Sequence, residues 1–252
     1  MLRLFTTFYK ESRAARAAEY RFCLERNLAS CIDQVCILTE AQSPGLPESK
    51  KIRVRQIDRR PTYDDFFRWI NELAQPEDFS LISNSDIWFD DSIGVALGNL
   101  THRECLAITR WDGNTLFDRN DSQDSWAWRG QVRAVRGDYP LGVPRCDNRL
   151  LYELRAAGYA VLNPALSVRT HHVHEGIRGE YTPANMDHFV EGPYGYLWPH
   201  NLRSLPRTLA HNLRHPERRI DWRLDRRKIA TMLPFRALRK VTRMVLPESA
   251  KA

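Results

Sequence analysis

The sequence predicts an α/β protein in which helices flank a mainly parallel sheet. From residue 1 to 174, short apolar runs alternate with amphipathic stretches, a pattern typical of parallel strands joined by helical crossovers. The 252 residues are enough for a sizeable core. Hydrophobic residues make up 42% and charged residues 27% of the chain, which excludes a disordered, collagen-like or coiled-coil protein.

The first half of the chain predicts the order β-α-β-β-α-β. Strands are expected over four apolar or alternating runs: 2–8, 35–38, 52–57 and 79–82. Helices are expected over 12–27 and from Pro61 onward, because apolar residues recur there at intervals of three or four.

The second half is less regular. Strands are expected over three further runs: 106–108, 159–162 and 166–168. A helix is expected from Asp147 to Ala157, with Asp147 capping its start and Gly158 ending it in the left-handed conformation. The Gly and Pro spacing in 175–201 predicts a loop.

The net charge of +7 is concentrated at the end of the chain. Residues 201–252 contain 14 Lys+Arg and 4 Asp+Glu, a balance of +10, which leaves 24 against 27, or −3, for residues 1–200. We therefore expect a slightly acidic body over 1–200 and a basic, partly amphipathic helical tail over 201–252. Because the body offers no continuous basic track, we expect no nucleic acid partner.

Residues 233–246 of this tail have the pattern of a short basic amphipathic helix. Lys and Arg flank apolar residues at helical spacing: Phe235, Leu238, Val241 and Val245. Such a helix binds the surface of an anionic membrane. The alternative is that its apolar stripe packs on the body.

Cysteine usage and hydropathy indicate the cytoplasm. The five cysteines form no C-x-x-C pair, which favours reduced thiols over disulfides or structural zinc. No apolar stretch reaches the roughly 18 residues of a membrane span, and the apolar opening of the chain is too short for a signal peptide. We expect a cytoplasmic protein, peripheral on the inner face of the membrane where its tail binds lipid.

Polar residues that follow predicted strands are the candidate site residues, because ligands of open parallel sheets bind at the carboxyl ends of the strands. Asn84-Ser85-Asp86 follows the strand at 79–82. These residues fit a turn, or else Asp86 is an oxygen ligand for Mg²⁺ or Mn²⁺.

Asp147 is the second candidate. N-capping of its helix accounts for it without any catalysis. A helix start also stabilises an ionised carboxylate, and a catalytic base that points into a cleft needs that property.

Three histidines lie within Thr170-His171-His172-Val173-His174. Strand alternation would direct His172 and His174 to one face, where imidazoles can complete a metal site that a carboxylate begins. The alternative is that they are solvated or structural histidines.

Asp124, Trp126 and Trp128 lie in an Asp- and Trp-rich stretch. Indole faces beside carboxylates suit a carbohydrate, whose hydroxyls need acceptors. The alternative is that both indoles belong to the core, since alternation places them on one face.

The order of these pieces, over residues 1 to about 175, resembles the GT-A fold nucleotide-sugar glycosyltransferases. Thr6–Lys10 looks like the opening strand and nucleotide-contact turn of that family. Asn84-Ser85-Asp86 looks like its D-x-D metal motif, with Asn84 in place of the first Asp. The segment from Cys146-Asp147-Asn148-Arg149-Leu150 to Ala157-Gly158-Tyr159 is similar to E-D-x-D-L-x-x-R-L-x-x-A-G-Y, with Cys146 where the family usually has Glu.

The resemblance implies a GT-A (Rossmann-like) fold over 1–200 and inverting sugar transfer from a nucleoside diphosphate sugar to a hydroxyl of a glycan or a lipid-linked saccharide. It implies Asp147 as base, and Mn²⁺ or Mg²⁺ held by Asp86 with His172 or His174. Four residues fall at the positions that would meet the nucleotide: Thr7, Glu40, Arg60 and Asn84. Three would meet the sugar or acceptor: Asp124, Trp126 and Trp128.

Two other classes of function remain as alternatives. A sugar nucleotidyltransferase shares a similar sheet but usually has a Gly-rich basic loop after its first strand, where this sequence has Tyr9-Lys10-Glu11-Ser12. A non-catalytic domain that binds membranes or nucleic acid would account for the basic tail alone.

Overall fold

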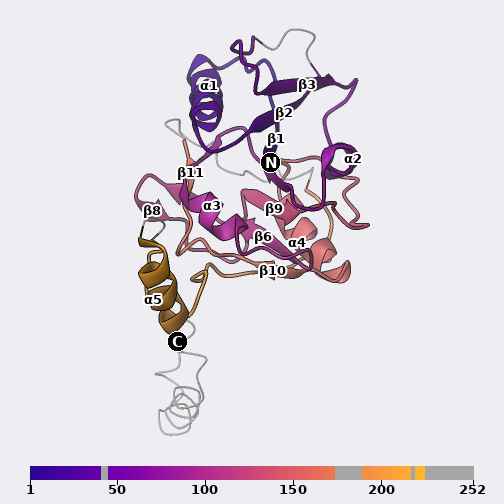
Figure 1. The fold of residues 1–252 in the computed structure, drawn as a ribbon. Helices are drawn as coiled ribbons and strands as arrows, with labels where there is room; N and C mark the ends of the chain where they lie inside the picture. Colours follow the sequence, from indigo (N-terminus) through magenta and orange to yellow (C-terminus); the bar gives the residue numbers. More distant parts are fainter. Residues whose placement is uncertain (41–44, 174–188, 217–218, 225–252) are drawn as a thin grey trace, which may run out of the picture.

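The fold is that of a computed structural model, which describes residues 1–40, 45–173, 189–216 and 219–224 (Figure 1). Its elements in chain order are β1 (Leu2–Thr7), α1 (Ala14–Ala29), β2 (Gln34–Thr39), β3 (Ile52–Gln56), α2 (Tyr63–Leu73), β4 (Phe79–Ser83), β5 (Ile87–Phe89), α3 (Ser92–Leu97), β6 (Glu104–Ile108), β7 (Trp111–Asp112), β8 (Thr115–Leu116), β9 (Ser125–Arg129), α4 (Cys146–Ala156), β10 (Ala160–Leu162), β11 (Thr170–His172) and α5 (Leu205–Arg214).

The main sheet has seven strands in the order β10-β6-β9-β4-β1-β2-β3. All of them run in one direction except β9, which is antiparallel to both of its neighbours, β4 and β6. The predicted mainly parallel sheet is therefore confirmed. The carboxyl ends of the parallel strands meet at one edge, and the reversed strand β9 begins at that same edge.

Helices cover both faces of this sheet, and Figure 1 shows α1 and α2 on opposite sides of β1–β3. Successive strand residues point to opposite faces, so neighbours in β1 enter different cores. Phe5 packs under α2, with its ring 5.6 Å from that of Trp69, in a core that α4 also enters. Leu4 packs on the other face, in a core that contains Tyr20 of α1 and Ile93 of α3.

A second, four-stranded sheet has the order β5-β11-β7-β8. Strand β5 follows β4 and strand β7 follows β6, and β11 pairs with both of them. This pairing sets His172 opposite Ile87 on one side and opposite Asp112 on the other. A late strand is thereby brought to the edge where β4 and β6 end.

One predicted strand is wrong. Residues 166–168 form a turn, because the N–H groups of Ser167 and Val168 both donate to the carbonyl of Pro164. The histidines consequently do not follow a strand, since His171 and His172 lie within β11.

The helix predicted at Asp147 begins one residue earlier. Arg145 is the N-cap residue, with a φ of 67°, and Asp147 lies in the first turn of α4 instead of capping it. The predicted end of the helix is confirmed, since Gly158 has a φ of 81°.

Helix α5 lies within the predicted basic tail. The amphipathic helix predicted over 233–246 falls outside the described residues. Within the part of the chain that the structure describes, no helix is both long and apolar enough to cross a bilayer.

Candidate active site

Three predicted site residues meet at the edge where β1 and β4 end and β9 begins. The Ser85 hydroxyl donates to the carbonyl of Thr7 at 2.7 Å, and the two side-chain hydroxyls lie 3.0 Å apart. The backbone N–H of Asn84 donates to the carbonyl of Asp124 at 3.3 Å. The strand order thus joins Thr7, Asn84 and Asp124, which are far apart in the chain.

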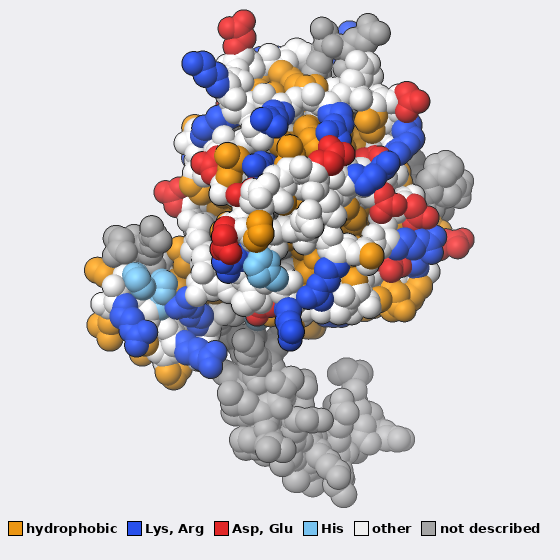
Figure 2. Space-filling model, turned by 45° about the vertical axis from the view of Figure 1, so that its right-hand side comes forward, with side chains coloured by type: hydrophobic (Ala, Val, Ile, Leu, Met, Phe, Trp, Pro, Cys, Tyr) orange, Lys and Arg blue, Asp and Glu red, His pale blue; other side chains and the backbone are white. Residues whose placement is uncertain are grey.

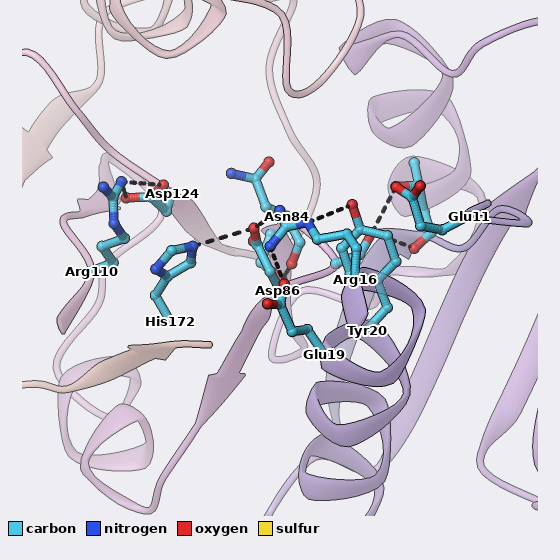
Figure 3. A network of polar contacts seen from close by, with 12 residues as sticks. Glu11, Arg16, Glu19, Tyr20, Asn84, Asp86, Arg110, Asp124 and His172 are labelled. Atoms are coloured by element: carbon cyan, nitrogen blue, oxygen red, sulfur yellow. Dashed lines mark hydrogen bonds and ion pairs between the residues drawn. The ribbon is translucent and has the colours of Figure 1, made fainter. Parts of the chain in front are cut away.

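One carboxylate oxygen of Asp86 contacts both an arginine and a histidine (Figure 3). Its Oδ2 lies 2.5 Å from Nη2 of Arg16 and 3.3 Å from Nε2 of His172. Burial disfavours the charge of Asp86, but His172 and Arg16 outweigh it and hold the pKa of this carboxyl at about 2, below its usual range. The other oxygen, Oδ1, is buried and has no hydrogen-bond partner among the described residues.

The polar network continues from His172 toward β9. Nδ1 of His172 lies 2.6 Å from Oδ1 of Asp112, which accepts from Nε of Arg110 at 3.2 Å. Nη1 of Arg110 also lies 3.1 Å from Oδ1 of Asp124. The side chains of His172 and Arg110 are each 4% exposed, so solvent screens their polar interactions only weakly.

Asp147 lies next to this network, at the start of α4. Its Oδ2 accepts the backbone N–H of Gln123 at 3.1 Å. Burial and the neighbouring Asp124 raise the pKa of Asp147 to about 6. We expected the helix start to favour the ionised form, but burial and the like charge outweigh it. A carboxyl with a pKa near 6 can accept a proton at neutral pH and release it again.

Trp126 and Trp128 lie in the core. Their side chains are 1% and 0% exposed, and their rings make edge contacts with Tyr63 at 5.3 Å and with Phe67 at 5.7 Å. The sugar-binding role expected of them is therefore corrected: neither indole presents a face to a ligand, because α2 covers them both.

Segment 190–197 runs along α4, from the residues just before the helix to its last turn, where Nη2 of Arg155 donates to the carbonyl of Tyr196 at 3.1 Å. The N–H of Val190 donates to the carbonyl of Pro144 at 3.0 Å, and the N–H of Gly195 donates to that of Asn148 at 2.8 Å. Gly195 allows this close approach, because an added Cβ would lie 2.9 Å from the backbone nitrogen of Tyr152. We call this segment the strap.

Exposed aromatic side chains lie at and just beyond the end of the strap. Tyr196 and Trp198 are 47% and 46% exposed, while Leu197 between them packs against the core. The Gln123 side chain donates to the carbonyl of Leu197 at 3.4 Å, and its backbone N–H binds Asp147. The two aromatics therefore belong to the same local structure as the candidate base.

The other predicted nucleotide contacts also lie at the carboxyl ends of strands. Glu40 follows β2 directly and is exposed. Arg60 lies in the connection from β3 to α2, and its Nη2 donates to the carbonyl of Leu141 at 2.9 Å. Arg60 lines a surface hollow of about 480 Å³ with Arg59, Thr62, Asp64, Arg68, Asp138 and Pro140.

The predicted metal ligands are only partly placed. Asp86 and His172 contact each other, and His174 lies outside the described residues. Among the residues that are described, no group of three His, Cys, Asp or Glu side chains is arranged to hold a metal ion.

No family model matches this chain, and no curated protein matches it either. Among solved structures, it is similar to a mannosyltransferase from Pyrobaculum calidifontis in complex with GDP-Man and Mn²⁺, at 11% identity and a TM-score of 0.48, over 71% of this chain and 58% of that one. It is also similar to mannose-6-phosphate isomerase from Helicobacter pylori, at 12% identity and a TM-score of 0.37, over 48% and 55%. A nucleotidyl transferase from Methanothermobacter thermautotroptrophicus matches at 11% identity and a TM-score of 0.32, over 51% and 71%.

Three members of the polar network, Arg16, Arg110 and Asp112, were not predicted from the sequence. Arg110 and Asp112 follow the predicted strand at 106–108, so the rule that singled out Asp86 would have found them too. Arg16 gave no comparable signal. It lies within an amphipathic helix among other charged residues, and its partner Asp86 is 70 positions away.

Proposed function

We propose that this chain is an inverting GT-A glycosyltransferase that moves a sugar from a nucleoside diphosphate sugar to an acceptor hydroxyl, with Asp147 as base. One observation carries the proposal. A carboxyl with a pKa of about 6 lies beside the sheet edge that also holds Thr7, Asn84 and Asp86. Ligands of open α/β sheets bind at this edge, and a base needs a pKa close to the working pH.

In this proposal Asp147 removes the proton of the acceptor hydroxyl. The acceptor oxygen forms its bond to the anomeric carbon while the bond from that carbon to the diphosphate breaks on the opposite face, which inverts the configuration. The proton remains on Asp147, and the electron pair of the broken bond leaves with the diphosphate. The charge of Asp124 favours the protonated form of Asp147, and the Gln123 N–H fixes its carboxylate.

The donor nucleotide would lie along the ends of β1, β2 and β4. Thr7 and Asn84 would meet it, together with Glu40 and Arg60, which follow the outer strands. Arg60 offers a guanidinium to a ribose or phosphate oxygen at an exposed position.

We propose that a divalent ion binds at Asp86 and that the phosphates of the donor complete its coordination. Oδ1 of Asp86 is buried without a partner among the described residues, and His172 lies beside the same carboxylate. Mg²⁺ in proteins is often held by one or two carboxylates together with substrate phosphates and water, so few protein ligands suffice. We propose Asp86, His172 and His174 as its ligands. When bound, Mn²⁺ or Mg²⁺ would neutralise the charge that grows on the diphosphate.

The acceptor would be a glycan or a lipid-linked saccharide bound at the start of α4. Since Trp126 and Trp128 are core residues, we assign the stacking role to Tyr196 and Trp198. Their exposed rings lie next to Leu197, whose carbonyl binds the Gln123 side chain. An aromatic ring binds the C–H face of a sugar.

The experiment is an assay of the purified chain with a panel of nucleoside diphosphate sugars, with and without Mn²⁺. Release of nucleoside diphosphate is measured for the native chain, for Asp147→Asn and for Glu72→Gln. Glu72 is an exposed carboxylate on α2, so its variant controls for a general effect of lost charge. Turnover that Asp147→Asn abolishes and Glu72→Gln retains supports the proposal. Pyrophosphate release from a nucleoside triphosphate and a sugar phosphate would identify a nucleotidyltransferase instead.

A further inference from the structure

Helix α5 exposes a stripe of leucines. Leu205, Leu209 and Leu213 recur every four residues, which places them on one side of the helix, and they are 42%, 55% and 84% exposed. The residue that α5 buries is Thr208. An apolar stripe of this kind on the surface of a protein indicates a partner.

Helix α5 and the residues next to it in sequence are basic. Residues 201–216 include Arg203, Arg207 and Arg214 together with two histidines, His211 and His215, but no Asp or Glu. Burial and the neighbouring Arg207 lower the pKa of Arg203, as expected where like charges gather. In Figure 2 the lobe at the lower left, where α5 lies in Figure 1, shows hydrophobic, basic and histidine side chains together and no acidic ones.

The positive charge of α5 favours some of the partners that could cover the leucine stripe over others. Residues 225–252 of the same chain contain 8 Lys+Arg and 2 Asp+Glu, so they would bring like charge to it. A second copy packed through the same stripe would set basic flank against basic flank. A surface that offers an apolar layer together with negative charge would favour both the leucines and the arginines.

We propose that α5 lies in the interface of an anionic membrane. Its leucines would enter the boundary between headgroups and acyl chains, and its arginines would contact lipid phosphates. The helix would lie along the surface. This assigns the membrane contact expected of the basic tail to a helix that the structure describes, and it does not depend on the proposed transfer reaction.

The test is cosedimentation of the full chain with vesicles of phosphatidylcholine, with and without phosphatidylglycerol. We expect binding to the vesicles that contain phosphatidylglycerol, weakened by salt because exposed charges are screened. The double variant Leu209→Asp/Leu213→Asp should bind about tenfold more weakly, since it loses apolar insertion and adds charge of the wrong sign. Both positions are exposed, and thermal melting checks that the variant folds.

Leu224→Asp is the matched control, because Leu224 is a 61% exposed leucine outside α5. It should bind as the native chain does. Unchanged binding of the double variant, an equal loss in the control, or equal binding to neutral vesicles would each overturn the proposal. Self-association that the double variant abolishes, without any vesicle binding, would identify a second copy as the partner and would also overturn it. No donor or acceptor is present in this assay, so its result is independent of the test of sugar transfer.

Discussion

The side chain on which the proposed chemistry depends is Asp147, and its pKa fixes a pH dependence. Only the ionised carboxylate accepts a proton, so kcat/KM should fall as pH decreases below about 6, by roughly tenfold per pH unit, and level off above pH 7. Above pH 7, Asp147→Asn should lower turnover by about two to four orders of magnitude, and the difference from the native chain should shrink below pH 6, where the native carboxyl is itself protonated. A pH-rate profile of the native chain measures this decrease, which is the acid limb of the profile. A flat profile between pH 5 and 7 would show that Asp147 is not the base.

Asp124 should act on that profile through its charge. Asp124→Asn removes a like charge from beside Asp147, so the pKa of Asp147 should fall and the acid limb should move to lower pH. Glu77→Gln is the control: it removes an exposed carboxylate distant in sequence from Asp147, and it should leave the acid limb at the same pH. A purely structural role for Asp124 would reduce activity without moving the limb, and the same pH-rate measurement separates the two.

Asp86 contributes to stability as well as to the proposed metal site. Its folded pKa of about 2 lies below the ordinary value of 3.8, so its stabilising effect is full above about pH 4 and is lost as pH falls toward 2. Asp86→Asn leaves Arg16 and His172 without this carboxylate and should lower the free energy of unfolding by about 3 kcal/mol at pH 7. Urea unfolding should show a smaller difference from the native chain at pH 3. An equal difference at both pH values would contradict the ion-pair account.

Single residues show how far sequence patterns reach. The rule that ligands bind at strand ends selected Asp86, and strand alternation selected His172, which the structure places in contact with it. The same reasoning left Trp126 and Trp128 undecided, because a buried and an exposed aromatic look alike in sequence. What decides between them is the cover that α2 provides, and that depends on tertiary packing.

Among the elements, the strap and α4 depend on close backbone contact. A Cβ at Gly195 would lie 2.8 Å from Cγ of Leu151 and 2.9 Å from the backbone nitrogen of Tyr152, and the backbone cannot move aside without disturbing the helix. Gly195→Ala should therefore cost about 1–3 kcal/mol of stability and raise KM for the acceptor. Gly94→Ala is the control, because nothing lies within 4 Å of its added Cβ. If both variants melted alike, the strap would not be packed as described.

Long periodic elements were predictable and very short ones were not. The helices α1, α2 and α4 each carry an apolar stripe with several residues, which periodicity detects. Strands β7 and β8 have two residues each, too few for any alternation to appear. The error at 166–168 has a local cause as well, since the carbonyl of Pro164 accepts the N–H groups that a strand would have directed to a neighbour.

At the scale of the whole molecule, the position of β9 in the sheet could not be predicted from local sequence patterns. It inserts between β4 and β6 against the direction of both, and its first residue then lies beside the carboxyl ends of the others. This reversal brings Asp124 to the edge that holds Asn84 and Asp86. The pairing of β9 with β6 is between near segments of the chain, but its pairing with β4 joins residues more than forty positions apart, and no local spacing in the sequence encodes it.

The whole molecule should also report donor binding through its melting temperature. A ligand that binds only the folded state at about 100 times its Kd adds about 2.7 kcal/mol, which corresponds to roughly 5–10 °C for a chain of this size. A nucleoside diphosphate sugar with Mn²⁺ should produce this shift in the native chain. Asp147→Asn should keep the shift, because the base does not hold the diphosphate, whereas Asp86→Asn should lose the part that depends on Mn²⁺. A shift that is the same with chelator and with Mn²⁺ would remove the metal from the proposal, and the absence of any shift across the donor panel would remove the nucleotide sugar as well.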